Sequence, residues 1–451
     1  MLLRFGVKNH RSIRSYQEIS LVASSLRDVE DGLISPEADV TDSSPRRSLR
    51  LVPVLALYGA NASGKTTILD ALQFFASGIV SSHDRSAGRT VPFRPFLLDD
   101  ESRKADSRYD ADIILDGVRY HYGYSITRER IESEWLYSFP ISGARRIRTV
   151  LFTRDAEAEE EFHFGKSLKG ENKVISKLVR PNSLFLSAAA QNSHPQLSEI
   201  FNFFAEKVTN RMQETSEHML PEQLLAYFGE DEALRERAVS FLAAADTGIV
   251  GLDFSKVPVD EKSLAFVAEF ERVLNNHLDG AEINVPKRTE HAKVGFKHLG
   301  SVGKKYAIEM DRESAGTIAL LGLLGPVLKR LSEGGVLVID ELNSTLHPLV
   351  SREIIRLFSD PTTNPGKAQL LFSTHDTNLL AGGLLRRDQI WFAEKDLEGA
   401  THAYSLSEIK VRRGDNFEAG YLQGRFGAIP FFGLGDSFLE DERGENSEVA
   451  G

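Results

Sequence analysis

Cysteine is absent from all 451 residues of the chain. Without a thiol, a disulfide framework, a thiolate zinc site, a cysteine-ligated iron–sulfur cluster and a cysteine nucleophile are all excluded. An excess of positive charge is also missing, because 54 lysines and arginines stand against 65 acids and leave a net charge of -11. This balance argues against a generally basic nucleic-acid coat, but it permits a local basic patch.

Long hydrophobic runs are missing as well. The first 16 residues contain no apolar core of signal-peptide length. The longest apolar run near them, residues 51–59, is about half of the ~20 residues that a membrane span needs. With 41% hydrophobic and 26% charged residues, the composition is typical of a folded protein with two or three structural units. We therefore expect a cytoplasmic protein that does not interact with a membrane.

The order of hydrophobic patterns predicts an α/β fold. Alternating residues predict short strands in residues 3–22 and between about 90 and 165, and Asp116-Gly117 is a hairpin signal within that second region. Amphipathic helices are predicted between about 194 and 280. Three continuous apolar strands then alternate with helices, which is typical of a buried parallel sheet; they cover residues 335–340, 368–374 and 389–394.

The sequence GANASGKT lies between a predicted strand and a predicted helix. It has the phosphate-loop pattern, in which glycines allow a tight turn and successive backbone N–H groups face the phosphates. Lys65 would reach the β- and γ-phosphates, and the Thr66 hydroxyl would coordinate Mg²⁺. The candidate nucleotide-binding residues of this segment are Gly59, Asn61, Ser63, Gly64, Lys65, Thr66 and Thr67.

Two carboxylates follow the predicted strand 335–340 and complement the phosphate loop. Asp340 would hold Mg²⁺, and Glu341 would polarise the attacking water. Asp340 lies 340 − 65 = 275 residues beyond Lys65, so the nucleotide-binding core must be split by a large insertion.

Several short motifs follow one another along the chain: RFGVKNHRSI near the N-terminus, GANASGKT, ESAGT from Glu313, VLVIDELNSTLHP, FSTHD and the late YLQGRFGAIP. Taken together and in this order, they resemble the ABC-class ATPase heads of the structural-maintenance-of-chromosomes, RecF and OLD type. They resemble more closely the stand-alone bacterial AAA family ATP-binding proteins that are associated with abortive infection and phage defence. A leucine-led LSGGQ signature is absent, which disfavours a transport ATPase.

The resemblance implies a head dimer with two nucleotides held between the protomers. Ser314, Gly316 and Thr317 of one chain would then meet the γ-phosphate held by Lys65 of the other. A helix N-terminus suits an anion, although a serine in this place is also an ordinary N-cap.

Further site residues follow from the resemblance alone. His375 matches the switch histidine at the γ-phosphate. Asn9, Arg11 and Ser12 match the first-strand motif near the nucleotide, with Arg11 on a phosphate. Gln191, after the strand-like SLFLSAAA, is a candidate for the glutamine that joins the two lobes and senses Mg²⁺; a surface glutamine is the alternative.

We thus predict an ABC-type P-loop head with a β-rich first lobe, a mostly parallel sheet core and a helical insertion. The predicted boundaries are 1–190 for the first lobe, 191–285 for the insertion, 286–435 for the second lobe and 436–451 for a flexible acidic tail. The predicted function is a Mg²⁺-dependent ATPase switch that forms a homodimer or higher homo-oligomer and controls a separate effector in anti-phage defence. A preference for ATP over GTP is not determined by these motifs.

Two other functions remain open. The first is a DNA-repair or chromosome-maintenance clamp that binds DNA across its dimerised heads, and the second is a scaffold that does not hydrolyse nucleotide. The intact phosphate loop and acidic pair count against the scaffold. Two basic stretches would serve DNA binding or form solvated charged faces; they comprise Arg145, Arg146 and Arg148, and Lys287, Arg288, Lys293, Lys297, Lys304 and Lys305. The ribonuclease-like spacing of Arg211 and His218 is expected by chance and is discarded.

Overall fold

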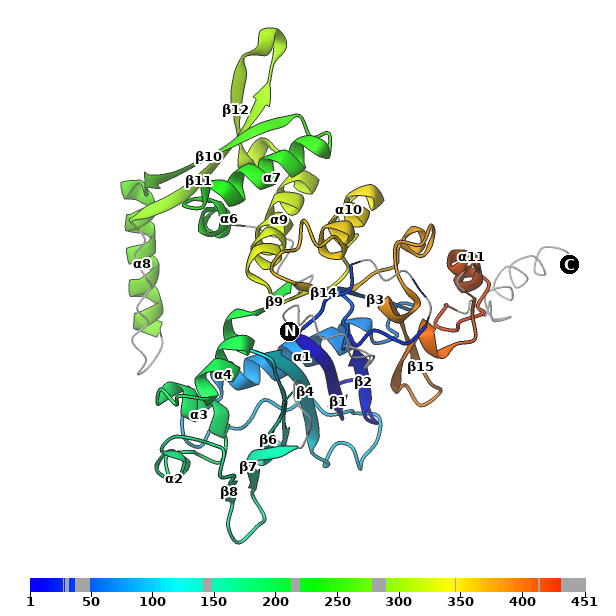
Figure 1. Cartoon of the computed structure of the whole chain (residues 1–451). Coiled ribbons are helices and arrows are strands. Elements are labelled where there is room, and N and C mark those ends of the chain that lie inside the picture. The colour runs from blue at the N-terminus through cyan, green and yellow to red at the C-terminus, as the bar shows by residue number, and fades with distance from the viewer. Residues whose placement is uncertain are drawn as a thin grey trace, which may run out of the picture.

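The structure is a computed structural model, and it describes residues 1–26, 28, 32–36, 49–140, 148–211, 220–277, 289–344, 346–412 and 414–430. The predicted tail therefore lies outside the described residues. The described strands form three sheets, and helices cover both faces of the middle one (Figure 1). The predicted α/β fold class is confirmed.

The first lobe contains a seven-stranded antiparallel sheet in the order β2-β1-β4-β5-β6-β7-β8. The predicted hairpin at Asp116-Gly117 joins β4 to β5, and both turn residues have positive φ values of 45° and 74°. The strands are β1 (Leu2–Lys8), β2 (Gln17–Ser20), β4 (Ser107–Leu115), β5 (Val118–Ile126), β6 (Ile131–Pro140), β7 (Thr149–Asp155) and β8 (Phe162–Phe164).

The central sheet has six strands in the order β16-β15-β3-β14-β13-β9. All its pairings are parallel except that of β15 with β16, as expected for buried apolar strands. The strands are β3 (Val54–Tyr58), β9 (Val208–Arg211), β13 (Val336–Ile339), β14 (Gln369–Ser373), β15 (Ile390–Lys395) and β16 (Thr401–Ser405).

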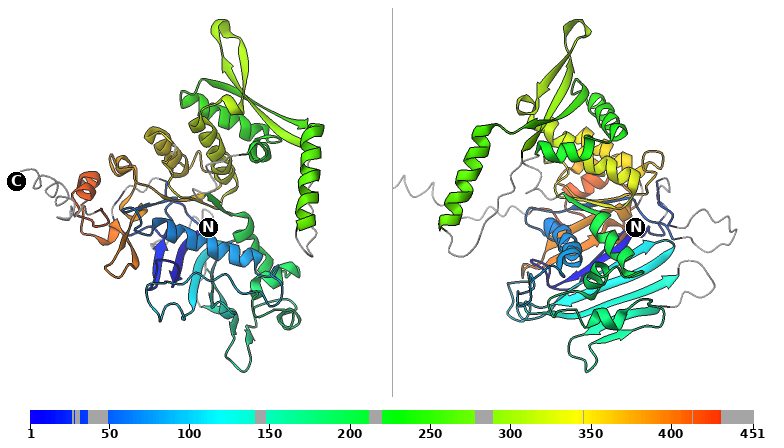
Figure 2. Two further views of the ribbon diagram at one scale, coloured as in Figure 1. Left: turned by 180° about the vertical axis from the view of Figure 1, so that it is seen from behind. Right: turned by 90° about the vertical axis from the view of Figure 1, so that its left-hand side faces the viewer.

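Helix α1 (Lys65–Ser81) lies between the antiparallel sheet and the central sheet (Figure 2). Its buried side chains recur at helical spacing and contact both sheets in one hydrophobic core, which also includes α3 (Phe185–Gln191) and α4 (Leu197–Glu206). The short helix α2 (Asn172–Ser176) packs on α3. Because α1 begins at the phosphate loop, this packing fixes the position of the loop.

The opposite face of the central sheet is covered by α9 (Ala315–Glu333) and α10 (Pro348–Ser359). Among the described residues, α9 is the one helix long and apolar enough to cross a membrane, but 61% of its apolar window is buried inside the protein. Its apolar residues belong to the hydrophobic core against the central sheet.

Between the two lobes the chain forms a mixed unit rather than helices alone. Helices α6 (Pro221–Phe228) and α7 (Glu232–Ala244) pack on α9, whereas α8 (Glu261–His277) extends along one side of the molecule (Figure 1). A three-stranded antiparallel sheet in the order β10-β11-β12 completes the unit; its strands are β10 (Ile249–Pro258), β11 (Glu290–Leu299) and β12 (Lys305–Glu309). The boundaries at 191 and 285 stay a prediction.

The segment SLFLSAAA was predicted to be strand-like, and this is wrong. Residues 185–191 form α3. The carboxylate of the buried Glu134 accepts hydrogen bonds from the first helical N–H groups, Phe185 N at 2.6 Å and Leu186 N at 3.0 Å. A short apolar run is ambiguous between strand and helix, and here a distant carboxylate caps the helix.

Candidate functional site

Three neighbouring strands of the central sheet bring the predicted site residues to one edge. The phosphate loop follows β3, His375 follows β14 and Asp340 follows β13. Because these strands are parallel and adjacent, their C-terminal ends lie side by side. Residues that are far apart in the sequence are thus gathered at the N-terminus of α1.

The phosphate loop has a backbone conformation that requires glycine. Gly64, directly before α1, has a φ of 108°, and a Cβ on it would lie 2.1 Å from Thr401 Oγ1. The neighbouring Ser63 Oγ is buried and has no hydrogen-bond partner among the described residues. An unsatisfied hydroxyl in a loop of this shape fits a site for a polar ligand such as a phosphate.

Lys65 is 5% exposed, and its ammonium group donates hydrogen bonds to the loop carbonyls of Gly59 at 2.9 Å and Ala60 at 3.0 Å. Burial lowers the pKa of Lys65 to about 8, although the nearby carboxylates of Glu341 and Asp340 act in the opposite direction. A bound anion would favour the protonated form.

Asp340 lies directly opposite Thr66. The Thr66 hydroxyl is 2.9 Å from Asp340 Oδ2, and Ser373 Oγ donates to Asp340 Oδ1 at 2.5 Å. A hydroxyl and a carboxylate in contact are two of the oxygen ligands that Mg²⁺ takes beside phosphates and water. The residues present therefore fit a magnesium ion bound together with a nucleotide.

Glu341 follows in a strained conformation. Its φ is 53°, in the left-handed region, and its backbone N–H donates to Ser373 Oγ at 2.8 Å. Such strain is often found at functional sites, where surrounding bonds hold a side chain in place. His375 is exposed at the same edge, and partial burial together with the charge of Lys65 lowers its pKa, so the neutral form is favoured.

Arg11 is held beside α1 rather than on the phosphate loop. Its guanidinium is 3.0 Å from Asp70 Oδ2, and the same carboxylate also binds His10 and Arg94. Arg11 and Arg94 line a cavity of about 540 Å³ together with Ser12 and Phe96. The contact of Arg11 with a phosphate is not tested by this arrangement and stays a prediction.

Two residues, Ser12 and Thr401, support the phosphate loop through hydrogen bonds. Only Ser12 was predicted from the sequence to lie near the nucleotide. Thr401 donates its hydroxyl hydrogen bond to Ser63 O at 3.0 Å, although the two lie 338 residues apart. Its Oγ1 is also 2.8 Å from Ser12 Oγ, which in turn contacts Thr67 Oγ1 at 3.2 Å. A lone threonine at the start of a strand carries no sequence signal for this role. Ser12 belongs to the first-strand motif, so its place near the loop agrees with that motif.

The ESAGT segment leads into α9, and its residues Ser314, Ala315 and Gly316 are exposed. Ser314 is the N-cap, because Thr317 N donates to Ser314 Oγ at 3.1 Å. Ala319, further along this helix, lines a small cavity with Asp340 and Glu341. The segment thus lies near the edge of the site with its first turn free to meet another molecule, and its contact with a partner's phosphate stays a prediction.

Gln191 is not brought together with Thr66 and Asp340. It is the exposed last residue of α3. That helix is tied to the C-terminal end of α1 by the hydrogen bond from His83 N to Ser187 Oγ at 3.2 Å, whereas Thr66 is in its first turn. The ends of this 17-residue helix are about 25 Å apart. The assignment of Gln191 to the metal is therefore not supported.

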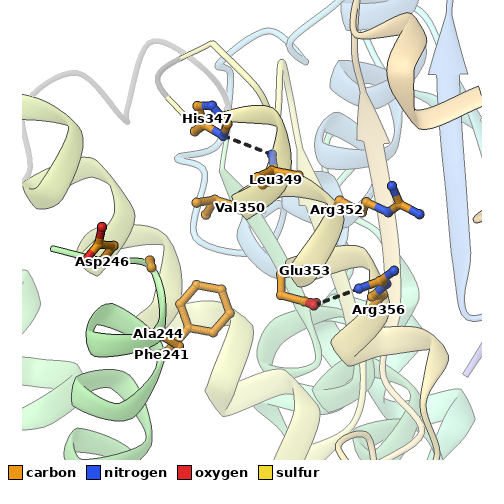
Figure 3. A pocket seen from close by; sticks show the side chains of 10 residues that line it. Phe241, Ala244, Asp246, His347, Leu349, Val350, Arg352, Glu353 and Arg356 are labelled. Atoms are coloured by element: carbon orange, nitrogen blue, oxygen red, sulfur yellow. Dashed lines mark hydrogen bonds and ion pairs between the residues drawn. The ribbon is translucent and has the colours of Figure 1, made fainter. Parts of the chain in front are cut away.

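A cavity of about 620 Å³ lies between the C-terminal end of α7 and α10 (Figure 3). Phe241, Leu349 and Val350 form its apolar part, and the ion pair of Glu353 with Arg356 lies at its edge. None of the phosphate-loop residues lines it, so it has no part in the nucleotide site described above.

Comparison with known proteins identifies the family of the chain. The sequence matches the family described as "AAA domain, putative AbiEii toxin, Type IV TA system" over residues 54–381, which is 328 of the 451 residues. No curated protein matches the sequence.

Solved structures with a similar arrangement include two Smc heads. One is the Smc head bound to the C-terminal winged-helix domain of ScpA, with 13% identity and a TM-score of 0.39 over 90% of this chain and 97% of that chain. The other is the Smc head with an extended coiled coil bound to the C-terminal domain of ScpA from Pyrococcus furiosus. It has 13% identity and a TM-score of 0.37 over 98% of this chain and 99% of that chain.

Proposed function

The chain belongs to the AAA-domain family that includes AbiEii-type proteins, and from this premise we propose that it is a Mg²⁺-dependent ATPase whose protomers associate on ATP and separate after hydrolysis. The observation that carries the proposal is the contact of Thr66 with Asp340 at 2.9 Å, next to Lys65 and Glu341. A phosphate loop and an acidic pair in contact are the parts that nucleotide hydrolysis requires.

The triphosphate would be held by the phosphate loop, with Lys65 giving up its bonds to loop carbonyls for bonds to phosphate oxygens. The nucleoside would occupy the cavity of about 540 Å³ beside Ser12, where Phe93 and Leu97 offer apolar surface and Arg94 a cation. Thr66 and Asp340 would hold Mg²⁺, which when bound neutralises charge on the phosphates. ATP is the proposed nucleotide.

Glu341 would orient the attacking water and accept its proton, because it is the partly exposed carboxylate beside the metal-binding Asp340. His375, at the end of the intervening strand, would donate a hydrogen bond to the γ-phosphate from its neutral ring. The hydrogen bond from its backbone N–H to Ser373 Oγ holds Glu341 in this strained conformation.

The exposed start of α9 supports an ATP-sandwiched homodimer. The exposed Ser314 and Gly316 and the helix dipole at this N-terminus suit an anion supplied by a second protomer, and Thr317, whose N–H donates to Ser314 Oγ, completes the turn. We propose that this cytoplasmic dimer, or a higher oligomer built from it, regulates a separate effector in anti-phage defence. A DNA clamp is the second candidate, and the lysine-rich β11–β12 region favours DNA contact.

Replacement of Glu341 tests the proposed chemistry. Glu341→Gln should retain ATP and Mg²⁺ binding but hydrolyse ATP at least about 100-fold more slowly, because the group that accepts the proton is lost. ATP-bound dimers should accumulate in sedimentation experiments. Gln191→Ala is the control and should hydrolyse ATP at the wild-type rate. Wild-type hydrolysis by Glu341→Gln would show that another group is the base.

A further inference from the structure

The β11–β12 hairpin projects furthest from the body of the described chain. It lies at the opposite end of the molecule from the seven-stranded sheet (Figure 1). Its two strands pair in register, with His298 opposite Tyr306 and Leu299 opposite Lys305. The chain reverses over residues 300–304, where Gly300 N donates to Lys304 O at 2.8 Å. The result is a narrow two-stranded ribbon with an exposed tip.

The charge of this ribbon is opposite to that of the whole chain. Residues 290–309 contain four lysines and two acids, although the chain has a net charge of -11. At the base of the sheet the lysines are neutralised, since Lys293 pairs with Glu309 at 2.7 Å and Lys297 with Asp253 at 2.6 Å. At the tip, Lys304 and Lys305 form no ion pair with any residue that the structure describes.

The two tip lysines point to opposite faces of the ribbon, because successive side chains of a strand alternate. Lys304 shares its face with Tyr306 and lies 5.3 Å from the centre of that ring. Lys305 lies on the other face, opposite Leu299. Unpaired positive charge is thus presented on both faces, next to an exposed apolar or aromatic side chain on each.

The end of the ribbon is strained and apolar. Val302 has a φ of 73° and is fully exposed, at 101%. Val302 and Gly303 both have positive φ, a turn in which asparagine followed by glycine is normally preferred. A β-branched residue is unfavourable there and gains nothing from burial within the chain. Its presence is explained if the side chain contacts another molecule.

We propose that the β11–β12 hairpin inserts into the major groove of duplex DNA, with Val302 against the base edges and Lys304 and Lys305 on the phosphates of the two groove walls. The major groove of B-form DNA admits a two-stranded ribbon, and thymine methyl groups provide apolar contacts within it. Cations on both faces match a groove with an anionic wall on each side. An acidic protein surface or a membrane would contact only the tip or one face of the ribbon, and so would not use the cations on both faces.

Fluorescence anisotropy of the full chain with a short labelled DNA duplex, measured over a series of salt concentrations, tests the proposal. Lys304→Ala/Lys305→Ala should weaken binding at least about tenfold and lower the slope of log affinity against log salt by about 2, as expected for the loss of two phosphate contacts. The double variant Lys293→Ala/Lys297→Ala, which removes equal charge from the neutralised base, should leave the slope unchanged.

The Val302→Gly variant distinguishes a contact of the Val302 side chain with DNA from an effect of this residue on the conformation of the turn. Glycine accommodates the positive φ, so the variant should melt at or above the wild-type temperature, yet its DNA affinity should fall several-fold with an unchanged salt slope. All of these variants should hydrolyse ATP like the wild type, so the result does not depend on the proposed ATPase function.

Three results would overturn the proposal. They are failure of the wild type to bind duplex DNA at low salt, wild-type binding by the tip variants, and equal or tighter tip-dependent binding to vesicles that contain phosphatidylserine. Tip-dependent binding to duplex RNA should be weaker than to DNA, because the A-form major groove is too narrow for the ribbon. Equal RNA binding would contradict the groove contact.

Discussion

Lys65 is deeply buried. Among the described residues, no carboxylate accepts a hydrogen bond from it. Its ammonium group is satisfied by the carbonyls of Gly59 and Ala60, which are neutral acceptors. Desolvation therefore dominates and lowers the pKa to about 8. The consequence is that the lysine we propose to bind phosphate loses its proton around pH 8.

This shift predicts a pH dependence of ATP binding. Bound phosphates favour the charged lysine, so its pKa rises on binding and the complex takes up a proton at pH above about 8. The affinity for Mg²⁺-ATP should be about tenfold weaker at pH 9 than at pH 7. Calorimetric titration at both pH values measures the affinity, and buffers of different ionisation enthalpy reveal the proton uptake.

The control is Lys65→Arg, which stays charged over this range. Its affinity, although weaker overall, should be the same at pH 7 and pH 9. If the wild-type affinity is also constant between these pH values, Lys65 does not have the lowered pKa that its burial implies.

At the scale of elements, the phosphate loop is held by two segments from opposite ends of the chain. Ser12, near the N-terminus, contacts Thr67, and Thr401, at the start of β16, contacts Ser63. The hydroxyls of Ser12 and Thr401 also lie 2.8 Å apart. The loop is therefore positioned before any nucleotide binds, which reduces the cost of ordering it.

Loss of this brace should weaken nucleotide binding. Thr401→Val keeps the shape of the side chain but removes its hydrogen bonds, at a cost of about 1 kcal/mol or slightly more. The affinity for ATP should fall about five- to tenfold. Thr401→Ser retains the hydroxyl and should bind ATP nearly as well as the wild type in the same titration. Unchanged ATP binding by Thr401→Val would show that these hydrogen bonds do not position the phosphate loop.

Local patterns predicted the parts of the site that are local in sequence. The strand, phosphate loop and helix around Lys65 are consecutive, and the acids follow their own strand, so the motif and the apolar run were sufficient. Their adjacency depends on the strand order β3-β14-β13, which the predicted parallel sheet allowed but did not specify.

Other elements depended on distant contacts. Helix α3 is capped by Glu134 from β6, and β9 joins the central sheet beside β13. Neither contact can be recognised from the residues of α3 or β9 themselves. For this reason SLFLSAAA was predicted to be strand-like, and Gln191 was placed near the metal. The position beside Asp340 belongs to Arg211, whose carbonyl accepts from Asp340 N at 3.1 Å.

At the scale of the whole molecule, the two lobes are joined through α1 and the central sheet, and the mixed unit between them projects from α9. Asn61, Ala62 and Thr66 of the phosphate loop are exposed, and so are Ser314, Ala315 and Gly316 of the ESAGT segment. We propose that each of these two places supplies half of a γ-phosphate site. Such a site would be complete only in a dimer, in which it is shared between the two chains.

Mixing two inactive variants shows whether the site is shared between chains. Ser314→Arg should bind ATP almost normally, because its phosphate loop is intact, but a bulky cation in the helix cap should prevent dimerisation. Lys65→Ala should fail to bind ATP, because the phosphates lose their main cation. In a mixed dimer, the Lys65 of one variant faces the Ser314 of the other, so one composite site is complete.

Sedimentation with a slowly hydrolysed ATP analogue should therefore show monomers for each variant alone and dimers for the mixture. ATP hydrolysis should reappear in the mixture at no more than about half of the wild-type rate per protomer, since each mixed dimer has one complete site. If Ser314→Arg alone dimerises and hydrolyses ATP like the wild type, Ser314 is only a helix cap and the shared site is contradicted.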